Sequence, residues 1–120
     1  MKIKICGITN KLDAFAAVDL GADALGFIIY EKSKRYIEPD KAIELARQLP
    51  PFVQRVAVTV DMAPRTILDL DAERAFDAWQ LHGAEKPQYC EKLKPLRLIK
   101  ALGFPLIPGV KPDAYDVDAF

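Results

Sequence analysis

The sequence has little of what several protein classes require. Its 120 residues include only two cysteines, too few for a disulfide scaffold. Neither sign of charge is in excess, because 17 Lys and Arg balance 17 Asp and Glu, so we expect no nucleic-acid surface. The longest apolar run covers residues 24–30, whereas a bilayer span needs about 20 residues. With no secretory signal pattern at its start, the chain is expected to be a soluble, cytoplasmic protein that does not contact membranes.

Short apolar runs alternate along the chain with amphipathic segments. Such alternation is typical of βα units, in which helices connect the strands of a parallel sheet. We expect strands over residues 2–6, 24–29, 53–60, 77–81 and 97–101. We expect helices between Asn10 and Gly21, from Pro39 to about Gln48, from Pro64 onward and from Pro87 to Leu93, and an irregular connection over residues 104–112.

The first helix has a recognisable start. Asn10 is a good N-cap, and Asp13 follows it at the spacing of a reciprocal cap. The apolar positions Leu12, Phe15, Ala16 and Leu20 fall on one helical face, which we expect to pack on the sheet.

The alternation of side chains within strands favours a closed barrel over an open sheet. Trp79 opposes Gln80 and His82, and Val56 and Val58 oppose residues 55, 57 and 59. We interpret the valine and tryptophan sides as facing helices and the other side as an interior with polar groups near the strand ends. An open doubly wound sheet would be apolar on both faces. The predicted strands start about 24 residues apart, so eight units need roughly 190 residues and this chain covers five units of a (βα)8 barrel.

A short pattern recurs at three strand starts. Residues 22–25, 76–79 and 117–120 share the form X-Asp-Ala-hydrophobic, and the first two open predicted strands. The third therefore predicts the start of a sixth strand. A strand cut at its beginning leaves its neighbour's edge uncovered, so we expect residues 1–120 to be the N-terminal part of a single barrel domain.

Three residues at strand ends and in a loop are candidates for catalysis or substrate binding. Cys6 ends the first strand, and Lys4 on the same face would stabilise its thiolate, making it a candidate base or nucleophile as well as a candidate core residue. His82, the only histidine, precedes a glycine at another strand end and has a structural alternative role. Arg35, in a basic loop after the second strand, is suited to hold a carboxylate. Cys90 is expected in the core.

Motifs for cofactors are missing from the sequence. It contains no glycine-rich phosphate fingerprint, no CxxC pair and no cluster with metal-ligand spacing. We therefore expect no nucleotide cofactor and no metal.

Five motifs together resemble phosphoribosylanthranilate isomerase of tryptophan biosynthesis. They are Lys4-Ile5-Cys6-Gly7-Ile8-Thr9, Gly21-Ala22-Asp23-Ala24-Leu25-Gly26-Phe27, Ser33-Lys34-Arg35-Tyr36, Leu49-Pro50-Pro51-Phe52-Val53 and Gln80-Leu81-His82-Gly83. They occur in the family's order over essentially the whole chain.

The resemblance implies a (βα)8-barrel isomerase without a cofactor. Its reaction is the Amadori rearrangement of N-(5'-phosphoribosyl)anthranilate, in which a carboxylic acid opens the sugar ring and a thiolate removes the C2' proton. Cys6 matches the general base. Arg35, His82, Gln80 and Lys4 match substrate-binding positions, with Arg35 on the anthranilate carboxylate. The family's acid and phosphate site come from later strands, so we expect these 120 residues alone to be inactive.

Two other functions stay open. One is a short half-barrel without catalytic activity. Such a protein would bind a ligand or would assemble, either as a homodimer or with a C-terminal half of the barrel. The other alternative is a different phosphosugar isomerase or epimerase on the same barrel, which the Gln80-Leu81-His82-Gly83 motif disfavours.

Overall fold

The computed structural model describes residues 1–103 and 105–120, and Phe104, the first residue of the predicted irregular connection, lies outside them. Five parallel strands form one sheet in chain order. The strands are β1 (Lys4–Cys6), β2 (Ala24–Ile28), β3 (Gln54–Thr59), β4 (Ala78–Leu81) and β5 (Leu98–Lys100). The helices are α1 (Lys11–Asp19), α2 (Pro39–Arg47), α3 (Pro64–Asp71) and α4 (Pro87–Glu91), followed by the 3-10 turn η1 (Pro112–Ala114). The predicted α/β order is confirmed.

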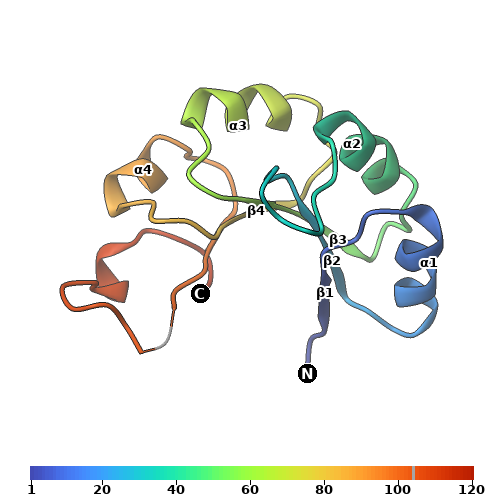
Figure 1. The fold of residues 1–120 in the computed structure, drawn as a ribbon, viewed down its shortest axis with the longest axis horizontal. Helices are drawn as coiled ribbons and strands as arrows, with labels where there is room; N and C mark the ends of the chain where they lie inside the picture. Colours follow the sequence, from blue (N-terminus) through green and yellow to red (C-terminus); the bar gives the residue numbers. More distant parts are fainter. Residues whose placement is uncertain (104) are drawn as a thin grey trace.

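The helices cover one side of a curved sheet (Figure 1). Parallel strands that neighbour each other in chain order, with every helix on the same side, produce continuous curvature, as in part of a (βα)8 barrel. A doubly wound sheet would place helices on both sides. The larger core cluster contains all the buried helix residues, whereas a second cluster on the concave side is built from strand residues alone, among them Val56, Val58 and Ala78.

The register of the strands corrects the faces predicted for β3. Phe27, Ala57, Trp79 and Leu98 are paired in a row across four strands, and all four belong to the helix-side core. Ala57 takes the helix side because a small side chain fits between Phe27 and Trp79, so the valines of β3 point to the concave side. The prediction that Val56 and Val58 face the helices was therefore wrong, while the faces predicted for Trp79 and Gln80 are confirmed.

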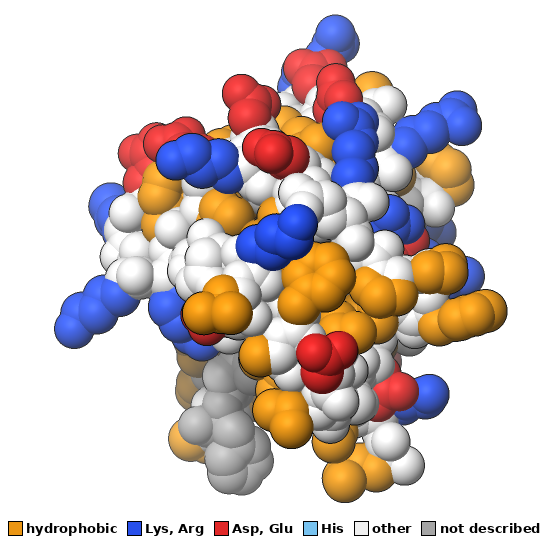
Figure 2. Space-filling model, turned by 90° about the vertical axis from the view of Figure 1, so that its right-hand side faces the viewer, with side chains coloured by type: hydrophobic (Ala, Val, Ile, Leu, Met, Phe, Trp, Pro, Cys, Tyr) orange, Lys and Arg blue, Asp and Glu red, His pale blue; other side chains and the backbone are white. Residues whose placement is uncertain are grey.

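The N-cap predicted for α1 is confirmed, whereas of the predicted apolar face only Phe15 packs against the core. The Asp13 backbone N–H donates to Asn10 Oδ1 at 2.8 Å. Leu12 and Leu20 are 81% and 89% exposed, whereas Ala14 is fully buried. Ala17 and Val18 pack against the same core beside Ala14, so the buried face of the helix is not the one that the leucines indicate. Figure 2 views this side of the molecule, where hydrophobic side chains gather in the centre and lower part.

The segment after η1 runs beside β5, as the recurring Asp-Ala pattern predicted. Ala119 forms a parallel bridge with Ile99, and the Lys100 N–H donates to the Ala119 carbonyl at 2.9 Å. Residues 101–111, apart from Phe104, contain turns and bends without a helix, in agreement with the predicted irregular connection.

Within residues 1–103 and 105–120, none of the helices has the length and apolar character that crossing a bilayer requires.

Candidate active site

The predicted site residues lie at the carboxyl ends of β1 and β4 and in the loop after β2. Because all five strands are parallel, these ends meet at one edge of the sheet. Strand β1 ends at Cys6 and β4 ends at Leu81, directly before His82, with β2 and β3 between them. Successive positions alternate between faces, so Lys4, Cys6 and Gln80 point to the concave side, away from the helices.

A glycine makes room for the Cys6 thiol. Gly26 is paired with Cys6 across β1 and β2, so the two positions share a face. A Cβ atom at Gly26 would lie 2.8 Å from Cys6 Sγ, closer than packed atoms tolerate. The thiol therefore occupies the space that a side chain at position 26 would take. Cys6 is half-buried and unpaired, a position in which a thiolate can reach a bound molecule.

Arg35 is held against the same strand end. Its Nη1 donates to the Cys6 carbonyl at 2.9 Å. Its side chain crosses directly over Gly7, where a Cβ atom would lie 2.5 Å from Arg35 Cδ, and Gly7 has a φ of 91°. The structure thus brings Cys6 and Arg35 together, two residues that the sequence analysis named separately. Arg35 remains exposed, and its other guanidinium N–H groups are able to bind an anion.

Lys4 lies on the same concave face as Cys6, two residues earlier in β1. It is half-buried, and no ion pair joins it to another described residue. Its predicted part in substrate binding is compatible with this position and is tested by no contact in the structure.

Gln80 and His82 form a pair at the end of β4. Gln80 Nε2 and His82 Nδ1 lie 3.3 Å apart, which orients the imidazole along the concave face. Gln80 is 9% exposed, whereas His82 is open to solvent. The His82 backbone N–H donates to the Thr59 carbonyl at 2.8 Å and extends the ladder one residue beyond the strand. A buried amide thus supports an exposed imidazole.

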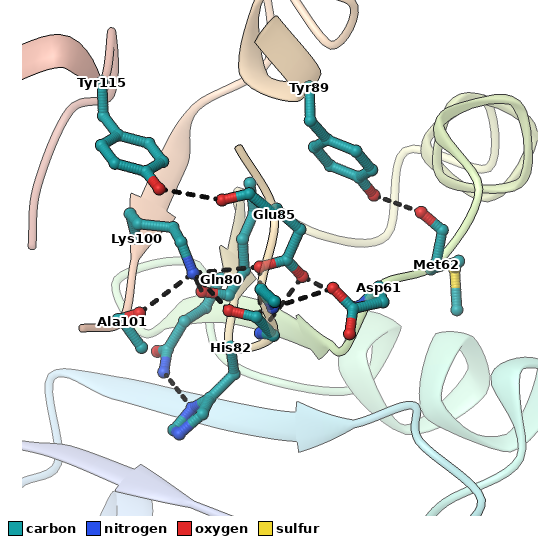
Figure 3. Close-up of polar contacts among 12 residues, drawn as sticks. Asp61, Met62, Gln80, His82, Glu85, Tyr89, Lys100, Ala101 and Tyr115 are labelled. Carbon is teal, nitrogen blue, oxygen red and sulfur yellow. Dashed lines mark hydrogen bonds and ion pairs between the residues drawn. The ribbon is translucent and has the colours of Figure 1, made fainter. Parts of the chain in front are cut away.

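A buried ionic network lies behind His82, and the sequence reasoning missed it. Lys100 Nζ lies 3.0 Å from Glu85 Oε2, and the two side chains are 2% and 1% exposed. The Glu85 carboxylate also accepts from the backbone of Asp61, in the loop after β3 (Figure 3). The position of Lys100 in the sequence could have predicted this network. Lys100 shares a strand face with Leu98, and a lysine on the face that the helices cover requires a buried anion.

Burial also raises the pKa of two side chains that neighbour this network. It raises the pKa of Tyr89 to about 12, and the phenol donates to the Met62 carbonyl. It likewise raises the pKa of the Cys90 thiol, which is fully buried in α4. A thiol that stays protonated is a poor nucleophile. Cys90 is thus a packing residue, as predicted.

A concavity lies next to the predicted site and is lined by different residues. It has a volume of about 600 Å3 and is bounded by the loop after β4 and the segment after β5, including Lys86, Lys111 and Tyr115. In the described part of the chain, no group of three His, Cys, Asp or Glu side chains converges as a metal site would require.

A family model described as N-(5'-phosphoribosyl)anthranilate (PRA) isomerase matches residues 3–119. A curated isomerase of that name from Thermotoga neapolitana is 48% identical over 104 residues, which are 86% of this chain and 51% of the relative. The chain spans about half the length of the curated relatives that it matches first.

Solved structures of this isomerase are also similar to the chain. A phosphoribosyl anthranilate isomerase in complex with reduced 1-(o-carboxyphenylamino)-1-deoxyribulose 5-phosphate has a TM-score of 0.82 and 48% identity over 86% of this chain and 54% of its own. A second structure, of monomers of the dimeric isomerase from Thermotoga maritima, has a TM-score of 0.79 and 44% identity over 86% and 53%.

Proposed function

Since this chain belongs to the N-(5'-phosphoribosyl)anthranilate isomerase family, we propose that it supplies the general base and the anthranilate-binding side of an active site for the Amadori rearrangement of N-(5'-phosphoribosyl)anthranilate. The observation that supports this most directly is the joint placement of Cys6 and Arg35. The thiol occupies the space left by Gly26, and the guanidinium donates to the carbonyl of the same cysteine.

In the proposed reaction, an acid protonates the furanose ring oxygen and the ring opens to a Schiff base. The Cys6 thiolate then takes the proton from C2' of the sugar, and the resulting enolamine becomes the ketone of the 1-deoxyribulose product. Arg35 holds the anthranilate carboxylate, with one guanidinium N–H already used on Cys6 and the others free for two parallel hydrogen bonds. The steps are proton transfers, so we propose that they need no cofactor or metal.

Three other side chains complete the proposed site. His82, oriented by Gln80, faces the substrate from the end of β4. Lys4 lies on the face of Cys6 and adds positive potential where the thiolate forms. Both unpaired cysteines fit a reducing compartment, and we place the reaction in the cytoplasm.

We propose that residues 1–120 form the N-terminal part of one barrel and that further βα units provide the acid and the phosphate site. Support comes from the first relatives, which are about twice as long, and from the free edge at β1, where Ile3 and Ile5 are 44% and 42% exposed. Unpaired strand edges are normally covered in native proteins. A C-terminal half of the barrel is the partner that fits this edge, and a second copy of the chain is the alternative.

Complementation tests the proposal. Residues 1–120 are joined to the C-terminal half of the Thermotoga maritima relative and expressed in a bacterium that lacks this isomerase and requires tryptophan. We expect growth with the chimaera and none with residues 1–120 alone. In the purified chimaera, Cys6→Ala should lower kcat by about 10²–10⁴-fold, whereas Cys90→Ala should retain activity.

The outcomes are separable. A folded chimaera that neither supports growth nor isomerises the substrate contradicts the proposed reaction. A Cys6→Ala chimaera with near-normal kcat leaves the reaction standing and removes Cys6 as its base. Growth with residues 1–120 alone would show that a second half is unnecessary, and light scattering would then report whether a homodimer completes the site.

A further inference from the structure

The carbonyl groups of Leu81 and Gly83, the residues before and after His82, both accept from one buried ammonium. Lys100 Nζ donates to the Leu81 carbonyl at 3.2 Å and to the Gly83 carbonyl at 2.8 Å. These two carbonyls flank His82 in the chain. The Leu81 carbonyl also accepts from the Ala101 N–H at 2.9 Å in the ladder to β5, and the His82 side chain projects away from Lys100, on the side of Gln80 (Figure 3).

The ammonium itself is fixed from every side. Besides the two carbonyls, Lys100 Nζ contacts the Ala101 carbonyl at 3.0 Å and Glu85 Oε2 at 3.0 Å. A lysine has three protons to donate, so four acceptors leave none for water. With its side chain 2% exposed, Lys100 has no freedom to move without breaking these contacts.

Glu85 holds the same segment through its N–H groups. Its carboxylate accepts from the Gly83 N–H, at 2.9 Å from Oε2, and from the Asp61 N–H, at 2.9 Å from Oε1. Asp61 in turn accepts from the Ala84 N–H at 2.8 Å. Asp61 approaches this closely only because position 83 is glycine, since a Cβ atom there would lie 2.6 Å from Asp61 Oδ1.

We propose that Lys100 and Glu85 are positioning residues that set the backbone at His82 and thereby aim its imidazole at the concave face. Their relevance to turnover rests on the substrate-binding role proposed above for His82. Neither side chain reaches the concave face itself. They act through the carbonyls of Leu81 and Gly83 and the N–H of Gly83.

A purely structural ion pair is the competing explanation. A buried ion pair replaced by apolar side chains of similar size often leaves stability unchanged or improved, because the desolvation of both charges is relieved. The double variant Glu85→Leu/Lys100→Met is therefore expected to fold. It removes the groups that hold the peptides beside His82 without leaving an unpaired charge, and so it separates positioning from stability.

The chain offers a direct probe, because His82 is its only histidine. The 120-residue chain with 13C-labelled histidine gives one imidazole signal, which reports on His82 alone. In the double variant we expect this signal to shift and broaden, and the amide hydrogens of Asp61 and Gly83 to exchange at least about tenfold faster. Lys92→Met, which removes an exposed lysine next to α4, is the matched control and should change neither.

The readouts distinguish this inference from the proposed function. A folded double variant with the His82 signal and the two amide exchange rates of the parent overturns the positioning role, whatever its activity. If the double variant fails to fold, Glu85→Gln is judged by the same two readouts. In the active chimaera, positioning predicts a raised KM with kcat nearly unchanged. Unchanged kinetics in His82→Ala would instead overturn the substrate-binding role of His82 and leave the positioning result intact.

Discussion

Asp118 and Leu98 exchange two hydrogen bonds across the start of β5: the Asp118 N–H donates to the Leu98 carbonyl at 2.8 Å, and the Leu98 N–H donates to Asp118 Oδ2 at 2.8 Å. The same reciprocal pair joins Asp23 to Ile3 and Asp77 to Arg55. The recurring Asp-Ala pattern therefore marks one device used at every second strand. The aspartate ties the start of its own strand to the start of the preceding one.

Removing one of these aspartates should lower stability. Asp77→Ala keeps its own backbone N–H bond to Arg55 but loses three bonds to the carboxylate: one from the Arg55 backbone N–H at 2.8 Å and two from the Arg55 guanidinium at 2.7 Å and 2.9 Å. We expect the free energy of unfolding to fall by about 2 kcal/mol, because hydrogen bonds to a charged group are lost together. Urea denaturation followed by fluorescence of Trp79, the only tryptophan, measures this. Asp69→Ala, which breaks an exposed pair with Arg65, should change stability by less than about 0.5 kcal/mol. Equal losses in the two variants would refute a special role for Asp77.

The same carboxylate predicts a pH dependence. Its hydrogen bonds with the Arg55 guanidinium hold the pKa of Asp77 below its ordinary value of 3.8. In acid the unfolded chain thus binds a proton that the folded chain does not, and stability rises with pH in that window. The contribution is complete above the ordinary pKa and is lost as the pH falls through the lower pKa of the folded state. Urea midpoints between about pH 3 and pH 6 should therefore fall more steeply on acidification for the parent than for Asp77→Asn. Parallel curves for the two proteins would contradict the assignment.

Two glycines with the same backbone conformation form a matched test of the Arg35 position. Gly7 and Gly21 have φ values of 91° and 93°, but a Cβ atom at Gly21 meets nothing within 4 Å. Gly21→Ala should cost only the backbone strain, about 1 kcal/mol. Gly7→Ala should cost at least about 1 kcal/mol more, because its methyl group displaces Arg35 from the Cys6 carbonyl. Urea denaturation of both variants gives the difference directly. Identical losses would mean that Arg35 moves aside freely and is not held by Gly7.

Gly26 should control the reactivity of Cys6. In Gly26→Ala the new methyl group crowds the thiol, and we expect slower alkylation of Cys6 by iodoacetamide together with a loss of about 1–3 kcal/mol in unfolding free energy. Cys90 is the internal control, since burial keeps it protonated and unreactive in the folded chain. Gly103→Ala, where a Cβ atom meets nothing within 4 Å, should leave both quantities unchanged. Alkylation of Cys6 at the parent rate in Gly26→Ala would show that the thiol does not depend on this space.

The sequence by itself determined the order of strands and helices, the cap formed by Asn10 and Asp13, and the placement of Cys6 and His82 at strand ends. These features are local. Periodicity, capping residues and prolines at helix starts act over a few neighbouring residues, so they can be read from the chain directly. The parallel direction of the strands follows from that order, because a helix between two strands returns the chain to the end where the previous strand began.

Only the tertiary structure decided which face of β3 meets the helices, that α1 packs through Ala14, and that Lys100 finds its anion in Glu85. Each of these depends on the register between strands or on the packing of a helix, and so on residues that are distant in the sequence. Phe27 and Trp79 crowd Ala57 from both sides only once three strands are paired. Such choices are set by the volume and charge of neighbours that the chain brings together in space, and no local pattern records them.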